Sequence, residues 1–401
     1  MTTAASGPAR LVHGAGIVMF ALAMGGFAIG TTEFASMSLL PYFARGLGID
    51  EPTAGHAISA YALGVVVGAP LIAVVGARLA RRTQLIAMMA VFAAGNALSA
   101  CAPSYHWLLL FRFLSGLPHG AYFGLAALVA TTLVPPNRRT MAVGRVMLGL
   151  TVATVIGVPV ASWVGQAVGW RSGFVIVAAL ALLTMALLAI YAPRDAAAHD
   201  ASPLRELGAL RRGQVWLTLA IGAIGFGGLF SVYTYLATTL TEVTHVSPAV
   251  VPIVLAVFGI GMTLGNIVVP WFADRALMAT AGGLLLFSAA TLIIFPWAAP
   301  HLGWMIVDVF FIGVGGALGT VLQTRLMDVA EDAQALAAAL NHSAFNTANA
   351  LGPFLGGLAI DAGLGWTSTG PVGCALALAG FLVWIVACLD ARRRVRVAAL
   401  A

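Results

Sequence analysis

One carboxylate lies deep inside a long apolar stretch of this chain. Glu33 stands in the sequence Gly-Thr-Thr-Glu-Phe, within an apolar run from about residue 14 to residue 40. A run of this length can cross a membrane as a helix, and a charged residue inside such a helix costs about 2.5–3.5 kcal/mol on insertion. A residue this costly predicts a functional site in a protein interior or wet cavity, where Glu33 can bind and release a proton.

Three further ionisable residues lie inside other apolar runs. Arg112 and Asp308 are each about six residues from the predicted outer ends of their runs, which places them in one layer with Glu33. Because a buried charge needs a partner, Glu33 and Arg112 are predicted to approach each other, directly or through water. The alternative is a permanent ion pair that only holds two helices together. Asp308 is a competing proton-coupling carboxylate or an interfacial residue, and His119 is a proton relay or a packing residue.

Polar residues in several spans indicate a binding cavity. The run 334–361 is unusually polar, and three of its polar residues share one helix face at three-to-four spacing. This face lines a cavity or a helix contact, because lipid would leave its polar groups unsatisfied. An apolar cavity with a few polar groups suits neutral or weakly polar small molecules. The predicted cavity residues are Thr32, Met37, Tyr233, Tyr235, Asn266, His342, Asn346 and Asn349.

The composition is that of an all-α membrane protein. Of the 401 residues, 61% are hydrophobic and 8% are charged, whereas soluble domains carry about 25% charged residues. The mean hydropathy is +0.98. Twelve runs of spanning length are predicted, at residues 14–40, 52–76, 83–102, 106–133, 141–168, 171–193, 214–240, 248–272, 279–298, 302–325, 334–361 and 369–389.

The distribution of positive charge predicts the orientation. The chain has no lysine, and if its N-terminus is cytoplasmic, 17 of its 20 arginines fall on the inner side. Arg45 and Arg171 fall outside, and Arg112 lies within a span. This bias predicts a multi-pass protein of the inner membrane with both termini in the cytoplasm. The basic character of the chain is therefore a topology signal, and no nucleic-acid partner is expected.

The chain also contains an internal repeat. One long polar loop, residues 194–213, separates a half at 1–193 from a half at 214–401, which ends in a basic tail. Duplicated halves are typical of secondary transporters, whose substrate site lies between them. The alternative, that glycine merely recurs in packed helices, does not explain one shared offset. At an offset of 197 residues, the matches are Gly64 with Gly261, Gly68 with Gly265, Arg78 with Arg275, Trp107 with Trp304, and Gly116 with Gly313.

Several local motifs carry a family resemblance. They are Gly-Thr-Thr-Glu-Phe at 30–34, Ser-Ala-Tyr-Ala-Leu-Gly at 59–64, Gly-Ala-Pro at 68–70 and Arg-Phe-Leu-Ser-Gly at 112–116. Together with the repeat, they resemble the twelve-span drug:proton antiporters of the major facilitator superfamily, in the YdhP/AraJ-like branch related to chloramphenicol-efflux proteins. The resemblance implies twelve transmembrane helices in two pseudo-symmetric six-helix bundles.

The same resemblance implies a set of conformational residues. The family's cytoplasmic loop pattern Asp-Arg-x-Gly-Arg-Arg becomes Ala-Arg-Leu-Ala-Arg-Arg at 77–82, and the second half keeps an Asp-Arg pair. In the family this loop latches the two halves together; the alternative is that its arginines only set topology. The glycine-rich antiporter motif of the fifth span is matched in part. The expected gating residues are Arg78, Arg81, Arg82, Gly149, Gly157, Pro159, Asp274 and Arg275.

These features predict a proton-coupled secondary transporter that exports drugs or other small molecules by alternating access. The alternatives are an arabinose-like sugar exporter, a purine nucleoside exporter and, more distantly, a non-transport polytopic membrane protein. An enzyme is not expected, because the sequence has no His-Glu-x-x-His, Gly-x-Ser-x-Gly or phosphate-loop motif. The expected partners are a small-molecule substrate, protons and the lipid bilayer. No cofactor or metal is expected, and the protein is expected to be a monomer.

Overall fold

All elements of the described chain are helical, so the predicted fold class is confirmed. The structure is a computed structural model. Arg78 and most of the predicted linker lie outside the residues it describes. The described residues are 14–49, 51–76, 79–194, 207–247, 250–331 and 333–400.

The first half of the chain folds into long apolar helices. Runs of Ala, Val, Leu and Ile suit a membrane because a helix satisfies its own backbone hydrogen bonds in lipid. The fifth span is interrupted between α6 and α7 by a wider π-type turn at Ala153–Gly157. The helices are α1 (Ala15–Ser38), α2 (Leu40–Leu47), α3 (Glu51–Gly76), α4 (Arg81–Ala100), α5 (Tyr105–Thr132), α6 (Arg139–Val152), α7 (Val158–Val168) and α8 (Arg171–Tyr191).

The second half repeats this pattern. Its helix α12 is two helices joined at a kink, where Ala276 has the non-helical dihedrals φ −152° and ψ 70°. Short turns at Leu207–Arg211, Gly315–Ala317, Ile360–Leu364 and Trp366–Ser368 connect or extend the longer elements. The helices are α10 (Gly213–Gly225), α11 (Gly227–Glu242), α12 (Val251–Ala298), α13 (Leu302–Val314), α14 (Leu318–Val329), α15 (Gln334–Ala359) and α16 (Thr369–Leu400).

The helices account for the twelve predicted spans. Within the described residues, ten helical segments are long and apolar enough to cross a membrane. One of them is α12, which supplies two spans because of its kink at Ala276. The polar helix α15, with 26 residues, is long enough for the remaining predicted span but is not among the ten apolar segments.

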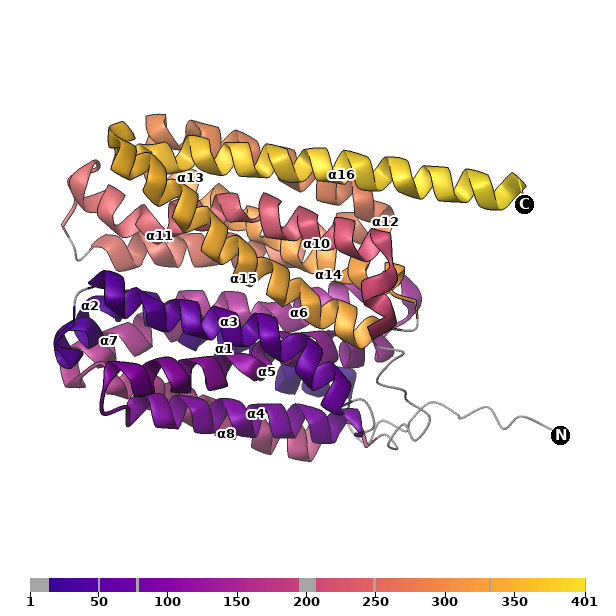
Figure 1. Ribbon diagram of the computed structural model, residues 1–401, viewed down its shortest axis with the longest axis horizontal. Coiled ribbons are helices and arrows are strands. Elements are labelled where there is room, and N and C mark those ends of the chain that lie inside the picture. Colours follow the sequence, from indigo (N-terminus) through magenta and orange to yellow (C-terminus); the bar gives the residue numbers. More distant parts are fainter. Residues whose placement is uncertain are drawn as a thin grey trace.

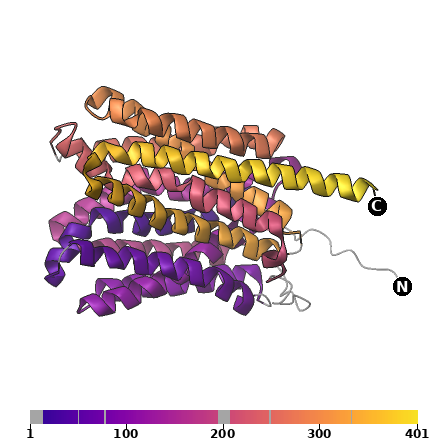
Figure 2. The same ribbon diagram turned by 45° about the horizontal axis from the view of Figure 1, so that its top comes forward.

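Two layers of helices face each other across the molecule. Figure 1 shows α1–α8, coloured indigo to magenta, in one layer, and α10–α16, coloured red to yellow, in the other. Figure 2 shows the same separation after rotation. Where the layers meet, α15 packs on α3 and α5, and α6 packs on α12. The helix α2 lies at one end of the bundle, and the C-terminal end of α16 extends beyond the opposite, inner end.

Close helix contacts reproduce the repeat seen in the sequence. A Cβ on Gly64 would overlap the carbonyl oxygen of Phe113, and a Cβ on Gly261 would overlap that of Phe310. The offset of 197 residues that relates the two glycines also relates the two carbonyl groups that they approach. Without a side chain, each glycine lets two backbones pack closely, which stabilises helix pairs in lipid. The two bundles are therefore pseudo-symmetric in their contacts as well as their order.

Candidate transport site

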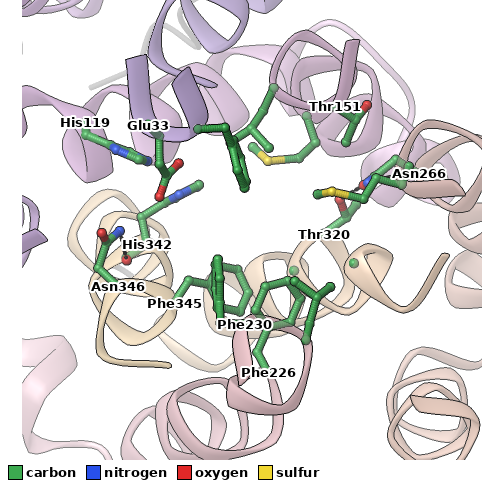
Figure 3. Close-up of a pocket in the computed structure, with 17 residues that line it drawn as sticks. Glu33, His119, Thr151, Phe226, Phe230, Asn266, Thr320, His342, Phe345 and Asn346 are labelled. Carbon is green, nitrogen blue, oxygen red and sulfur yellow. Dashed lines mark hydrogen bonds between the residues drawn. The ribbon is translucent and has the colours of Figure 1, made fainter. Parts of the chain in front are cut away.

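A buried cavity is lined by residues of both halves of the chain (Figure 3). Its volume is about 60 Å³, which gives room for about four water molecules. The lining combines four phenylalanines with a small number of polar groups. The lining residues are Glu33, Phe34, His119, Met147, Leu150, Thr151, Phe226, Leu229, Phe230, Met262, Asn266, Gly316, Gly319, Thr320, His342, Phe345 and Asn346.

One end of the cavity is polar. Figure 3 shows Glu33 from α1, His119 from α5, and His342 and Asn346 from α15 gathered there, with the Glu33 carboxyl group pointing toward the imidazoles. The two imidazole rings come from opposite halves, and their centroids are 5.2 Å apart. The His342 ring also stacks on Phe123 with the centroids 4.3 Å apart. The cavity thus places a carboxylate beside two imidazoles at the junction of the halves.

Arg112 lies behind Glu33 and outside the cavity lining. Its side chain is 1% exposed, and Nη1 donates a hydrogen bond of 3.1 Å to Thr32 Oγ1. Thr32 donates in turn to Asn96 Oδ1 at 2.8 Å. The Arg112 guanidinium carbon also lies 4.4 Å from the centroid of the Tyr61 ring, at cation–π distance. Among the described ion pairs within 4 Å, none joins Arg112 to Glu33.

The other end of the cavity carries a second polar group. Asn266 Nδ2 donates to the carbonyl oxygen of Met262 at 3.0 Å, and the Thr320 hydroxyl donates to Asn266 Oδ1. Between the two polar ends, the wall is formed by Phe34, Phe226, Phe230 and Phe345. The cavity is therefore apolar along its length and polar at both ends, as expected for a small-molecule site.

The structure brings five of the predicted proton-coupling and cavity residues together and leaves the others apart. Those that line the cavity are Glu33, His119, Asn266, His342 and Asn346.

The remaining predicted residues lie outside the lining. Tyr233 packs edge-on against Phe34 with the ring centroids 5.5 Å apart, and Tyr235 donates to the carbonyl oxygen of Pro353 at 2.9 Å. The two tyrosines are two residues apart, which places them on opposite faces of α11. Asp308 is buried in α13, with Oδ2 lacking a hydrogen-bond partner in the described structure. Those outside the lining are Thr32, Met37, Arg112, Tyr233, Tyr235, Asp308 and Asn349.

Aromatic residues complete the site and were not predicted from the sequence. Phe226 and Phe230 are four residues apart and so share one face of the seventh span, a spacing that could have identified them. Phe345 stands directly beside the polar positions of α15. The hydroxyl group of Tyr61 lies 2.9 Å from His119 Nδ1. Tyr61 belongs to a motif recognised in the sequence, but no local feature of the sequence predicts its contact with another span.

At the inner end of the molecule, polar contacts join the two halves. Asp274 Oδ1 accepts a hydrogen bond of 3.0 Å from the backbone N–H of Thr140, in the first turn of α6. This carboxylate from the second half thereby caps and electrostatically stabilises a helix N-terminus in the first half. Arg139 and Asp328 add an ion pair of 3.1 Å across the same junction.

Two predicted gating arginines, Arg82 and Arg275, have partners within their own halves. Arg82 donates to the carbonyl oxygens of Leu188 and Ala189 near the end of α8, a favourable place for a cation. Arg275 lies over the ring of Trp271 on its own helix, with its guanidinium carbon 3.6 Å from the ring centroid. Arg81 is half-buried at the start of α4. Asp274 is thus one predicted gating residue that joins the halves at this end.

Replacing Asp274 with alanine is expected to favour opening at the inner end. Loss of a cap on a helix costs about 1 kcal/mol, which would raise the open population roughly fivefold. The measurement is the distance between spin labels on Asn137→Cys and Ala279→Cys, exposed positions near the inner ends of the two halves. The native cysteines are replaced in this background. An unchanged distance distribution, or an equal change in the control Asp361→Ala, would contradict the prediction.

The predicted glycines of the fifth span lie against α1. A Cβ on Gly149 would overlap the carbonyl oxygen of Ala23, and one on Gly157 would overlap the Thr31 hydroxyl. Pro159 stands in the first turn of α7, directly after the π-type turn. These residues hold the broken fifth span tightly against the helix that carries Glu33.

Two pseudo-symmetric bundles of spanning helices around a central buried cavity define the architecture of a secondary transporter. Solved structures share this fold. The Escherichia coli fucose:proton symporter FucP matches with a TM-score of 0.73 at 14% identity, covering 94% of this chain and 99% of that one.

Sequence comparisons give the family. The model of the Major Facilitator Superfamily matches residues 22–282 and 232–399. The inner membrane transport protein YdhP of Escherichia coli K12 is 41% identical over 92% of this chain and 95% of its own length. The chloramphenicol resistance protein of Streptomyces lividans is 34% identical over 84% of this chain and 87% of its own length. The chain belongs to the Major Facilitator Superfamily and is a multi-pass transporter of the inner membrane, not an enzyme.

Proposed function

We propose that this protein exports small lipophilic molecules in exchange for protons, by alternating access. The observation that carries the proposal is the position of Glu33, a buried carboxyl group that faces a cavity between the two halves. A carboxylate within a membrane is costly, and its place beside an interface that must open gives it a route to either side. The transport path lies within one chain, which suits a monomer.

The proposed cycle begins with the site open to the outside. A proton binds Glu33, the halves close outside and open inside, and the proton leaves to the cytoplasm. The cytoplasmic substrate then enters the vacated cavity and is carried outward. The membrane potential supplies about 2.3 kcal/mol per charge for each 100 mV, in addition to the pH gradient.

The lining of the cavity supports a lipophilic substrate. The phenylalanine wall offers a large apolar surface, whereas a sugar would require several polar partners along its length. The chloramphenicol resistance relative agrees with a drug-type substrate. An arabinose-like sugar and a purine nucleoside remain test compounds of the same experiment.

Replacing Glu33 with glutamine is expected to abolish substrate-driven proton flux while the protein stays folded, because glutamine keeps the shape of the side chain but cannot carry the proton. Purified protein is placed in liposomes with a pH-sensitive dye inside, under an imposed proton gradient. Chloramphenicol, tetraphenylphosphonium, arabinose and a purine nucleoside are then added in turn.

The matched control is Glu242→Gln, which changes an exposed glutamate at the end of α11 and should behave like the wild type. If none of the compounds drives proton flux but one shows counterflow, the protein is a facilitator. Glu33 would then have a structural role.

A further inference from the structure

Three buried polar atoms at one end of the cavity have no hydrogen-bond partner in the described structure. They are Nε2 of His119, Nε2 of His342 and Oδ1 of Asn346. The three side chains are 1%, 4% and 3% exposed, respectively. All three line the cavity beside Glu33 (Figure 3). Buried polar groups in native proteins are almost always satisfied, so this end of the cavity is built to receive polar groups from water or a ligand.

The hydrogen-bonding capacity of these groups is unbalanced. Asn346 Nδ2 donates to the carbonyl oxygen of His342 at 3.0 Å, which leaves the amide oxygen, a pure acceptor, for the cavity. The ionised Glu33 carboxylate is also a pure acceptor. His119 Nδ1 lies 2.9 Å from the Tyr61 hydroxyl group, so its Nε2 donates or accepts according to the tautomer. A ligand that displaces water from this end would satisfy Asn346 Oδ1 and the Glu33 carboxylate if it brings at least two donors.

The charge of the lining also favours a ligand with a positive head group. Among the described lining residues, Glu33 is the one carboxyl group and none is an arginine. Arg112, the nearby cation, is held outside the lining by Thr32 and Tyr61. A positive head group would therefore meet a carboxylate and no cation within the lining itself, while phenylalanine faces would interact favourably with the charge.

We propose that the transported substrate is an arylalkyl amine, protonated at neutral pH and carrying at least two N–H groups. Its ammonium head is held by Glu33, Asn346 and the two imidazoles, and its ring lies along the phenylalanine wall in a state in which the halves have separated enough to enlarge the cavity of about 60 Å³. This proposal rests on the proposed function and specifies the substrate of the same cavity. A quaternary ammonium has the same charge but no N–H donor, and it would leave the buried acceptors unsatisfied. A neutral alcohol brings one hydroxyl donor and no charge.

Three probes that differ only in the head group test the proposal. They are 2-phenylethylamine, its trimethylammonium analogue and 2-phenylethanol, titrated calorimetrically into the purified full-length protein at neutral pH. The primary amine is expected to bind about tenfold or more tightly than either analogue, because a site built for donors discriminates against ligands that lack them. Equal or tighter binding of the trimethylammonium compound or the alcohol would overturn the proposal.

Variants of α15 locate the contact. Asn346→Leu is expected to remove most of the amine's advantage, whereas Asn346→Asp, which keeps an acceptor oxygen, is expected to retain it. His342→Phe keeps a ring to stack on Phe123 and removes Nε2, so it should weaken amine binding selectively. The matched control is Asn349→Leu, on the same helix but outside the lining. A loss for all three probes alike, or no loss in either cavity variant, would refute the assignment.

These binding results are independent of proton coupling. Selective amine binding without amine-driven proton flux in liposomes would support the binding assignment and overturn the antiport mechanism. Proton flux driven by another compound, with no preference among the three probes, would overturn the amine assignment and leave antiport standing.

Discussion

Replacing Gly149 with alanine is expected to destabilise the folded protein by about 3 kcal/mol, because overpacking of a closely packed contact costs up to this amount. The added Cβ would overlap the carbonyl oxygen of Ala23 and lie 2.9 Å from the backbone nitrogen of Phe27, both in α1. Neither atom can move without displacing that helix. The opposite side of the contact is also close, since a Cβ on Gly30 would come within 2.9 Å of the carbonyl oxygen of Leu150.

The effect should reach the transport site as well. Glu33 lies one turn beyond Gly30 on α1, so a displaced α1 moves the carboxyl group away from the imidazoles. Stability is measured by thermal unfolding in detergent, and transport by proton flux in liposomes. The control is Gly283→Ala, at an exposed position of α12 where an added Cβ meets no atom within 4 Å. If Gly149→Ala unfolds like this control, the close approach of α1 and α6 is not a source of stability.

The fold could be predicted from the sequence because its signals are local. Hydropathy predicted the apolar spans that the structure contains, and the scarcity of arginine in the predicted outer loops predicts the orientation. The repeat was visible because close backbone contacts require glycine at the same positions in both halves. Gly116 and Gly313 illustrate this, since an added Cβ would overlap the carbonyl oxygens of Tyr61 and Phe258, respectively. The position of such a glycine can be read from the sequence, so the close contact that it permits can be predicted.

The site could be predicted only in part, because its geometry depends on how separate helices rotate and dock. The cost of burying Glu33 was evident from one span alone. The contact between His119 and His342 depends on how α5 packs against α15. The spacing of residues within either helix cannot predict it. Likewise, the depths of Glu33 and Arg112 agreed with a direct approach. The choice of Thr32 as the hydrogen-bond partner of Arg112 is decided by side-chain conformation.

Replacing Arg112 with methionine is expected to abolish transport while leaving stability within about 1.5 kcal/mol of the wild type, as for volume-conserving core substitutions. The guanidinium group is fully buried, yet its described partners are the neutral Thr32 hydroxyl and the aromatic rings of Tyr61 and Phe174. Neutral partners offset little of the free energy needed to desolvate a buried charge. An apolar side chain of similar length can therefore replace the guanidinium group.

Transport should be lost because of the effect that we expect this charge to have on Glu33. Arg112 lies beside the helix turn that carries Glu33, where its positive charge acts on the proton affinity of that carboxyl group. The test pairs thermal unfolding with substrate-driven proton flux. Unfolded Arg112→Met protein would show that the guanidinium group is needed to join α1, α3 and α8. Folded variant protein with wild-type flux would separate Arg112 from proton coupling altogether.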